Sequence, residues 1–215
     1  MTILVRLFRL LPVLVLALWA LPTVAQERVG VTTAVNPEAI GAHPGGATRP
    51  IVIGQDVVAN EHISTGTAGQ TQILFLDQSA MTIGPNSDLA IDRFVYDPKT
   101  GTGTLTMSTT RGVLRYIGGK ISKNPDAVTI RSGATVVGIR GGVVLLEVSQ
   151  AGKTDVIAIH PDGPTVVGQN GVSQILARDN DMVSVASPGG TPTPPTPAPS
   201  SLTSHLLSQL TISDH

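Results

Sequence analysis

The stretch TQILFLDQSAMTIGPNSDLAIDRFVYDPKTGTGTLTMS, residues 71–108, decides the fold class. Short apolar runs follow one another, and each ends in Asp, Asn, Gly or Pro, the residues that favour tight turns. In LAID (89–92) and LTMS (105–108), successive side chains alternate between an inward and an outward face, as in a strand. The stretch therefore predicts strands at residues 71–76, 80–83, 89–96 and 102–107.

The same rhythm extends over residues 28–186, where the helical period is almost missing. Further strands are predicted at 51–58, 112–117, 127–131, 135–139, 143–148, 155–160, 165–167, 174–178 and 182–185. Their spacing of roughly ten residues is typical of all-β folds such as a sandwich, barrel or β-solenoid. Because the chain has only three Phe, two Tyr and one Trp, the core must consist of Val, Ile and Leu. We expect an all-β stack of short strands around a thin, layered core.

Three segments depart from this rhythm. Residues 35–50 are rich in Gly and Pro and are predicted to form a long surface loop. Residues 187–200 contain TPTPPTPAP and predict a stiff linker that ends the domain. In the tail, residues 201–215, four leucines share one helical stripe and indicate a short helix: Leu202, Leu206, Leu207 and Leu210. We expect this tail to be an attachment element held away from the domain; the alternative is that its leucines fold back onto an apolar patch and cover an open edge of the β stack.

The first 25 residues have the three-part pattern of a signal peptide. Arg6 and Arg9 precede an apolar run at 10–20, and the small residues Thr23 and Ala25 precede a predicted cut before Gln26. The run is shorter than the roughly 20 residues of a spanning helix, although retention as a membrane anchor is the alternative. The chain then divides into a signal peptide (1–25), a β domain (26–186), a linker (187–200) and a tail (201–215). The mature protein is predicted to be soluble, in the periplasm or outside the cell.

Composition narrows the function classes. Without its signal peptide, the chain carries 12 Lys and Arg against 15 Asp and Glu, a net charge of −3 that does not suggest a nucleic-acid partner. With no cysteine, the chain has no disulfide, no thiolate metal ligand and no cysteine nucleophile. The five histidines follow no metal-ligand spacing, and Ser79 has no local histidine signature that would mark a nucleophile. We therefore expect no catalytic residues, no cofactor and no metal site.

The Gly-rich segment 138–142, GIRGG, lacks the spacing of a phosphate-binding loop and predicts a corner between two strands. Arg140 in this corner is either exposed or partly buried with a carboxylate or carbonyl partner, and we expect a structural role for it. Between Arg111 and Arg140, six basic residues face one acid, Asp126. Such a surplus marks either a site for an anionic ligand or partner, with Arg111, Arg115 and Arg140 as the candidates, or a solvated face balanced by acids elsewhere.

Five short motifs occur in a fixed order: I-S-T at 63–65, an apolar strand ending in D-Q-S at 72–79, G-P-N-S at 84–87, R-G-V at 111–113 and G-I-R-G at 138–141. Together they resemble the FecR domain over roughly residues 50–150. Gln78 stands where the family usually has a turn glycine, and Gly142 stands where threonine usually follows R-G. The resemblance implies an all-β stack of short strands and protein or glycan binding outside the cytoplasm.

The best-known members of that family regulate sigma factors through a cytoplasmic segment and a spanning helix, and they bind the signalling domain of an outer-membrane receptor. Here a signal peptide replaces the cytoplasmic part, so transmembrane control of a sigma factor is not implied. The leading hypothesis is an exported, non-enzymatic interaction or sensing module that binds an envelope or extracellular protein or a glycan. The alternative is a structural attachment protein of an envelope assembly or export system.

Overall fold

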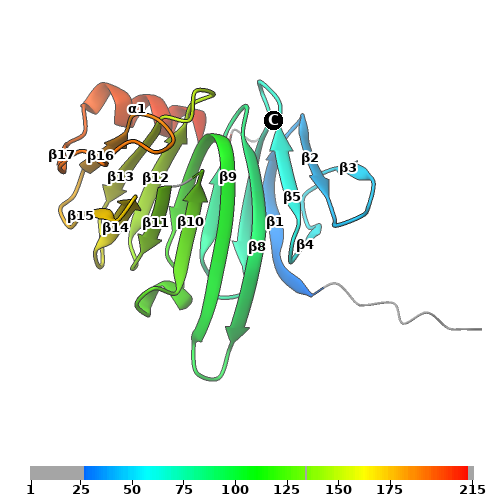
Figure 1. Cartoon of the computed structure of the whole chain (residues 1–215). Coiled ribbons are helices and arrows are strands. Elements are labelled where there is room, and N and C mark those ends of the chain that lie inside the picture. The colour runs from blue at the N-terminus through cyan, green and yellow to red at the C-terminus, as the bar shows by residue number, and fades with distance from the viewer. Residues whose placement is uncertain (1–26, 134, 213–215) are drawn as a thin grey trace, which may run out of the picture.

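The alternating strands of the sequence fold into two β-sheets, A and B, stacked face to face in the computed structural model, which describes residues 27–133 and 135–212 (Figure 1). The predicted signal peptide, residues 1–25, lies outside the described residues. The strands in sheet A stand in the spatial order β4, β1, β6, β7, β9, β12, β13, β16 and β17. Their bounds are β1 (Arg28–Asn36), β4 (Asp56–Val58), β6 (Gln70–Phe75), β7 (Ala80–Ile83), β9 (Thr102–Ile117), β12 (Val143–Val148), β13 (Thr154–Ile159), β16 (Asp181–Val185) and β17 (Thr196–Pro197).

Sheet B has the order β3, β2, β5, β8, β9, β10, β11, β14 and β15. Its further strands are β2 (Ala39–Ala42), β3 (Thr48–Pro50), β5 (His62–Thr65), β8 (Asp88–Asp97), β10 (Val128–Ser132), β11 (Thr135–Ile139), β14 (Thr165–Gln169) and β15 (Val172–Leu176). Strands β9 and β10 run parallel, and the other pairs of both sheets are antiparallel. A short 3-10 helix, η1 (Ile121–Lys123), follows β9.

Strand β9 belongs to both sheets. Its first part pairs with β8 and β10 in sheet B, and its last part, residues 112–117, pairs with β7 and β12 in sheet A. The sequence predicts two separate strands here, at 102–107 and 112–117, whereas the structure contains one strand that changes sheet at Gly112. Strands that switch sheets in this way make the corners of stacked β folds.

The space between the sheets is filled mainly by Ile, Val and Leu side chains. Aromatic residues are few, and the rings of Phe75 and Phe94 stack at 5.7 Å between centroids. The predictions of an all-β stack and of an aliphatic, layered core are confirmed.

The predicted surface loop at residues 35–50 is wrong. Strand β1 continues to Asn36, and β2 and β3 follow within the same segment. Glu38, at φ +73°, makes the tight turn that the segment needs between β1 and β2. The partner that stabilises β2 is β5, a strand about twenty residues further along, so the local density of Gly and Pro misled the prediction.

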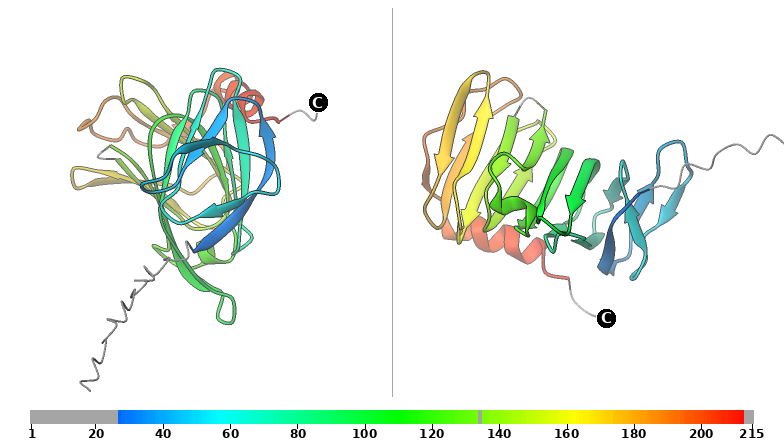
Figure 2. Two further views of the ribbon diagram at one scale, coloured as in Figure 1. Left: turned by 90° about the vertical axis from the view of Figure 1, so that its right-hand side faces the viewer. Right: turned by 90° about the horizontal axis from the view of Figure 1, so that it is seen from below.

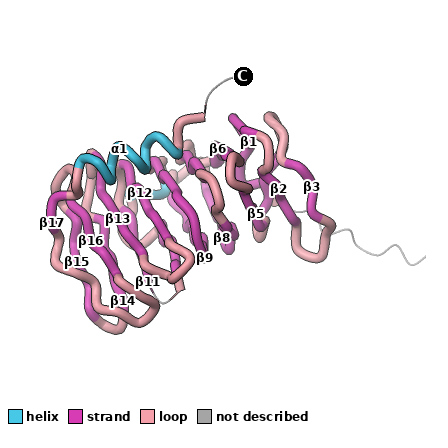
Figure 3. The backbone as a smooth tube through the Cα atoms, turned by 90° about the horizontal axis from the view of Figure 1, so that it is seen from above, coloured by secondary structure: helices cyan, strands magenta, loops and turns pink. Residues whose placement is uncertain are grey.

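The predicted helix in the tail is confirmed as α1 (Ser200–Gln209), but the expectation that the tail stands away from the domain is wrong. The helix lies across the outer face of sheet A (Figures 2 and 3). Leu206 and Leu210 are buried there against Val113, Leu145 and Ile157, and form a second, smaller core. Burial of apolar surface at roughly 25 cal/mol per Å² is the physical reason why this leucine stripe folds back. Within the described ranges, no helix is long and apolar enough to cross a membrane.

The Pro-rich segment is likewise part of the domain. Its β17 pairs with β16, and the N–H of Thr193 donates to the carbonyl of Ser184 at 2.9 Å. Ala198 donates to the carbonyl of Asn180 at 2.8 Å. Because prolines have no N–H, the free side of this segment offers few donors to another strand. The segment therefore covers the edge of sheet A, in the way that the alternative interpretation expected of the leucine stripe.

Candidate binding site

The D-Q-S motif, Asp77–Ser79, forms a turn that hydrogen bonds stabilise. The buried Asp77 carboxylate accepts hydrogen bonds through Oδ1 from the N–H and Oγ of Ser79, at 3.1 and 2.6 Å. Its Oδ2 accepts the N–H of Ile121 at 3.2 Å, which ties the β6–β7 turn to η1. Gln78 has φ +70°, so it adopts the left-handed conformation that a glycine would take most easily.

Tyr116 lies fully buried beside this turn. Burial raises the pKa of its hydroxyl well above the ordinary value, and the nearby Asp77 carboxylate raises it further. The tyrosine therefore stays neutral, and together with Asp77 and Ser79 it belongs to the scaffold of the domain.

The I-S-T and G-P-N-S motifs hold the corner of β9. Thr65 donates through Oγ1 to the carbonyl of Gly84 at 2.7 Å and accepts the N–H of Ser87 at 2.9 Å. The Oγ of Ser87 accepts the N–H of Val113 at 3.1 Å, directly after Gly112. A Cβ on Gly112 would lie 2.1 Å from Ser87 Oγ, so the R-G-V motif needs its glycine for this close approach.

The G-I-R-G segment forms the predicted corner between β11 and β12. Gly141 and Gly142 have φ +77° and +75°, and the N–H of Gly142 donates to Asp162 Oδ2 at 3.2 Å. Arg140 is exposed, and among the described residues it makes no ion pair and no side-chain hydrogen bond. The expectation that Arg140 positions the turn is therefore not supported; the two glycines and Asp162 shape it.

The structure separates the three candidate arginines. Arg111 lines a groove beside the C-terminal end of α1, and Arg115 lines a hollow of about 270 Å³ on the other side of that end. Arg140 lies with Lys123 and Asp162 in a hollow of about 350 Å³. Since Val148 pairs with Gly112 and Val143 with Ile117, Arg140 stands at the opposite end of the β12 strand from Arg111. The three arginines do not form one site.

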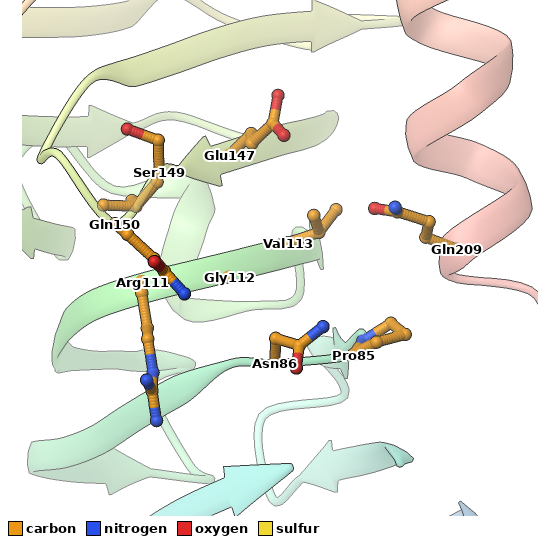
Figure 4. A pocket seen from close by; sticks show the side chains of 10 residues that line it. Pro85, Asn86, Arg111, Gly112, Val113, Glu147, Ser149, Gln150 and Gln209 are labelled. Atoms are coloured by element: carbon orange, nitrogen blue, oxygen red, sulfur yellow. The ribbon is translucent and has the colours of Figure 1, made fainter. Parts of the chain in front are cut away.

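The groove at Arg111, of about 190 Å³, combines groups from four parts of the chain (Figure 4). Asn86 comes from the β7–β8 turn, Arg111 from the β9 corner, Glu147 from the end of β12, and Gln209 from α1. The backbone carbonyl of Gln209 accepts Gln70 Nε2 at 2.6 Å, which fixes the helix end as a wall of the groove. Gln209 Oε1 is buried without a hydrogen-bond partner among the described residues.

This arrangement suits binding. Its lining contains a cation, a carboxylate and amide groups, the groups that recognise a peptide backbone or sugar hydroxyls. No cluster of three or more His, Asp or Glu side chains that could hold a metal ion occurs in residues 27–133 and 135–212. Sequence reasoning found Arg111 but missed Glu147 and Gln209. Glu147 could have been found from the sequence, because it is the one charged residue in the apolar strand 143–148.

These features define an all-β domain of two sheets. Its five sequence motifs form turns and corners that stabilise the fold, and its polar groove opens beside α1. Residues 61–160, which are 100 of the 215 residues, match the family model described as FecR protein. The match covers all five motifs noted in the sequence, and the resemblance to this family is confirmed. No curated protein matches the chain.

The fold is similar to two crystal structures of a protein described as a "putative anti-sigma factor" from Parabacteroides distasonis ATCC 8503. The first has a TM-score of 0.53 at 13% identity over 68% of this chain and 63% of that chain. The second has a TM-score of 0.52 at 14% identity over 68% of this chain and 64% of that chain. The chain thus matches less than two thirds of the length of these proteins, and at this identity the similarity concerns the fold.

Proposed function

We propose that the chain is a regulatory sensing module without enzymatic activity, which is exported and binds an envelope or extracellular protein or a glycan. The observation that carries this proposal is the FecR domain at residues 61–160, in a fold shared with proteins described as anti-sigma factors. The Asp77–Ser79 turn and the β9 corner hold the scaffold, which leaves recognition to the surface of the domain.

The Arg111–Glu147 groove is the proposed binding site. Glu147 is partly buried, and neither it nor Arg111 takes part in an ion pair among the described residues. The guanidinium of Arg111 and the carboxylate of Glu147 point in opposite directions in Figure 4, so a ligand that contacts both would be an extended one, such as a peptide, whose groups both donate and accept. The buried Oε1 of Gln209 adds an acceptor that a ligand donor would satisfy.

The test is a quantitative crosslinking pull-down of the full chain from the cell envelope, comparing the natural protein with the double variant Arg111→Ala, Glu147→Gln. The double variant should lose the crosslinked partner and keep its melting midpoint. Arg131→Ala is the matched control, because Arg131 is an exposed arginine on β10 of sheet B, away from the groove. Equal recovery of the partner by the double variant and the control would contradict the groove as the site.

The regulatory part is tested separately. A strain that lacks the gene and a strain that carries the double variant should show the same change in transcript profile. An unchanged profile in the deletion strain would overturn the regulatory role and leave only binding.

A further inference from the structure

A continuous row of apolar side chains crosses the outer face of sheet A. Each member stands directly opposite the next on six adjacent strands, β1, β6, β7, β9, β12 and β13. In this order the members are Val31, Leu74, Ala80, Ile117, Val143 and Ile159. We call this set the apolar row.

Two members of the row, Leu74 and Ile117, are exposed to solvent; the other four are partly buried, and Ile159 packs against the small core under α1. The residues next to its members along the strands, such as Ile73, Met81 and Tyr116, point into the core and are fully buried. Leu74 and Ile117, in contrast, are 42% and 37% exposed. Exposed apolar residues are ordinary when scattered, but a contiguous patch marks an interaction site.

The same face already holds a helix. Leu145 and Ile157, which α1 covers, lie on β12 and β13 two residues from Val143 and Ile159 of the row. Two residues along a strand span about 6.6 Å, and packed helices lie about 8–10 Å apart. A second helix packed alongside α1 would therefore lie over the apolar row. Leu207 of α1, 36% exposed, offers such a helix a further apolar contact.

Arg115 supplies the charge beside the row. It stands opposite Thr82 and Leu145, two residues from Ile117, where α1 has ended. One Nη donates to Thr82 Oγ1 at 3.2 Å, while the Nε is buried without a partner. No carboxylate pairs with Arg115 among the described residues. Leaving the Nε of this partly buried guanidinium without an acceptor is costly, and a carboxylate is the group that satisfies a guanidinium best.

We propose that the apolar row is the docking surface for an amphipathic helix of a partner protein, which packs apolar side chains on the row and places an acidic side chain on Arg115. The six strands span about 24 Å, the length of roughly 16 helical residues. The helix presents apolar residues at i, i+4 and i+8, the spacing with which α1 uses Leu202, Leu206 and Leu210 on the same face. The row is separate from the Arg111–Glu147 groove, so the two proposals fail independently.

The test uses two synthetic helical peptides of matched length with leucines at i, i+4 and i+8, one with glutamates along one flank and the other with lysines there. Binding to the full chain is measured by fluorescence anisotropy. The acidic peptide should bind more tightly, and Ile117→Asp should weaken it roughly tenfold or more, because the row loses an apolar contact and gains a like charge. Arg115→Gln should reduce the preference for the acidic peptide.

Val136→Asp is the matched control, since Val136 is an exposed β-branched residue on the outer face of sheet B, and it should bind as the natural protein does. If Ile117→Asp lowers the melting midpoint, Leu74→Asp tests the same row. Equal binding of the two peptides, or equal losses in Ile117→Asp and Val136→Asp, would overturn the proposal. Two further results would also overturn the proposal, because they would show that the row has another partner. One is a dimer of the chain that Ile117→Asp dissociates, and the other is binding to phosphatidylglycerol vesicles that Ile117→Asp abolishes.

Discussion

Gly112 is the residue at which β9 leaves sheet B and enters sheet A. Its φ of +111° is unfavourable for any residue with a Cβ, and an added Cβ would lie 2.3 Å from the Cα of Ser87. Gly112→Ala should therefore lower the free energy of unfolding by about 2–5 kcal/mol, from backbone strain and overpacking together. Urea unfolding followed by circular dichroism measures this loss.

Gly101→Ala is the control for that prediction. Gly101 also has a positive φ, +71°, but a Cβ there would meet no atom within 4 Å. Its substitution should cost only the backbone strain, about 1 kcal/mol. If the two variants lose equal stability, the contact between Gly112 and Ser87 does not decide the corner.

Tyr116 makes stability depend on alkaline pH. Burial raises the pKa of its hydroxyl in the folded state, so ionisation is easier in the unfolded chain. The contribution of the neutral Tyr116 hydroxyl to the free energy of unfolding is complete below the pKa of about 10 that tyrosine has in the unfolded chain, and it is lost as the pH rises above this value. The free energy of unfolding should fall above about pH 10, and Tyr116→Phe should make this fall less steep.

Spectroscopy provides an independent check on Tyr116. The chain has two tyrosines, so Tyr96→Phe leaves Tyr116 as the only one. In that variant, tyrosinate absorbance should appear together with the loss of the folded circular dichroism signal. Absorbance that rises while the fold is intact would show that the hydroxyl is accessible to solvent.

At the scale of elements, strands bounded by clear turn residues could be predicted from the sequence. The strands at 80–83, 135–139 and 143–148 have the predicted bounds. Strands β1, β2, β3, β5 and β17 were missed; β2 is stabilised by pairing with β5, and β17 by pairing with β16. Such pairing is non-local, and prolines within β17 argue against a strand on local grounds.

The candidate site, too, could be predicted from the sequence only in part. The surplus of basic residues pointed to Arg111 and Arg115, and both lie beside the end of α1. The surplus could not reveal that Arg140 lies apart from them, because that depends on the register of β12 against β9. Nor could it reveal Gln209, which reaches the groove only because α1 folds back across sheet A.

Helix α1 offers a prediction at this scale. Leu206 is fully buried against sheet A, so Leu206→Ala should leave a cavity and cost about 2–5 kcal/mol. Leu207→Ala, the neighbouring leucine on the exposed side, should cost about 1 kcal/mol or less. Thermal unfolding of both variants decides whether the tail is part of the fold, and equal melting midpoints would show that α1 contributes little.

On the scale of the whole molecule, both proposed surfaces lie on one side. The Arg111–Glu147 groove and the apolar row flank the C-terminal end of α1 on sheet A. The outer face of sheet B is mixed: Thr106 stands opposite Thr129 and Ser108 opposite Arg131, and Val136 and Ile175 are exposed on the same face. Because both proposed surfaces belong to sheet A, a partner protein is expected to approach sheet A, and α1 is the element that it would contact from both surfaces.

The last prediction concerns export. The fold engages the chain from Glu27 onward: its carbonyl accepts the N–H of Ala59 at 3.0 Å, and Val29 is fully buried. A cut between Ala25 and Gln26 would thus leave in place every contact that the described residues make with one another. Mass spectrometry of the exported protein should find a chain that begins at Gln26.

Signal peptidase requires small residues one and three positions before the cut and tolerates larger ones between them. Ala25→Tyr should therefore block processing, whereas Val24→Tyr, one position earlier, should leave it unchanged. Both variants keep the apolar run and the basic residues Arg6 and Arg9, so they enter export equally. If the natural protein is found in the membrane fraction with Arg6 still attached, the apolar run is an anchor, and a freely diffusing periplasmic or extracellular module is excluded.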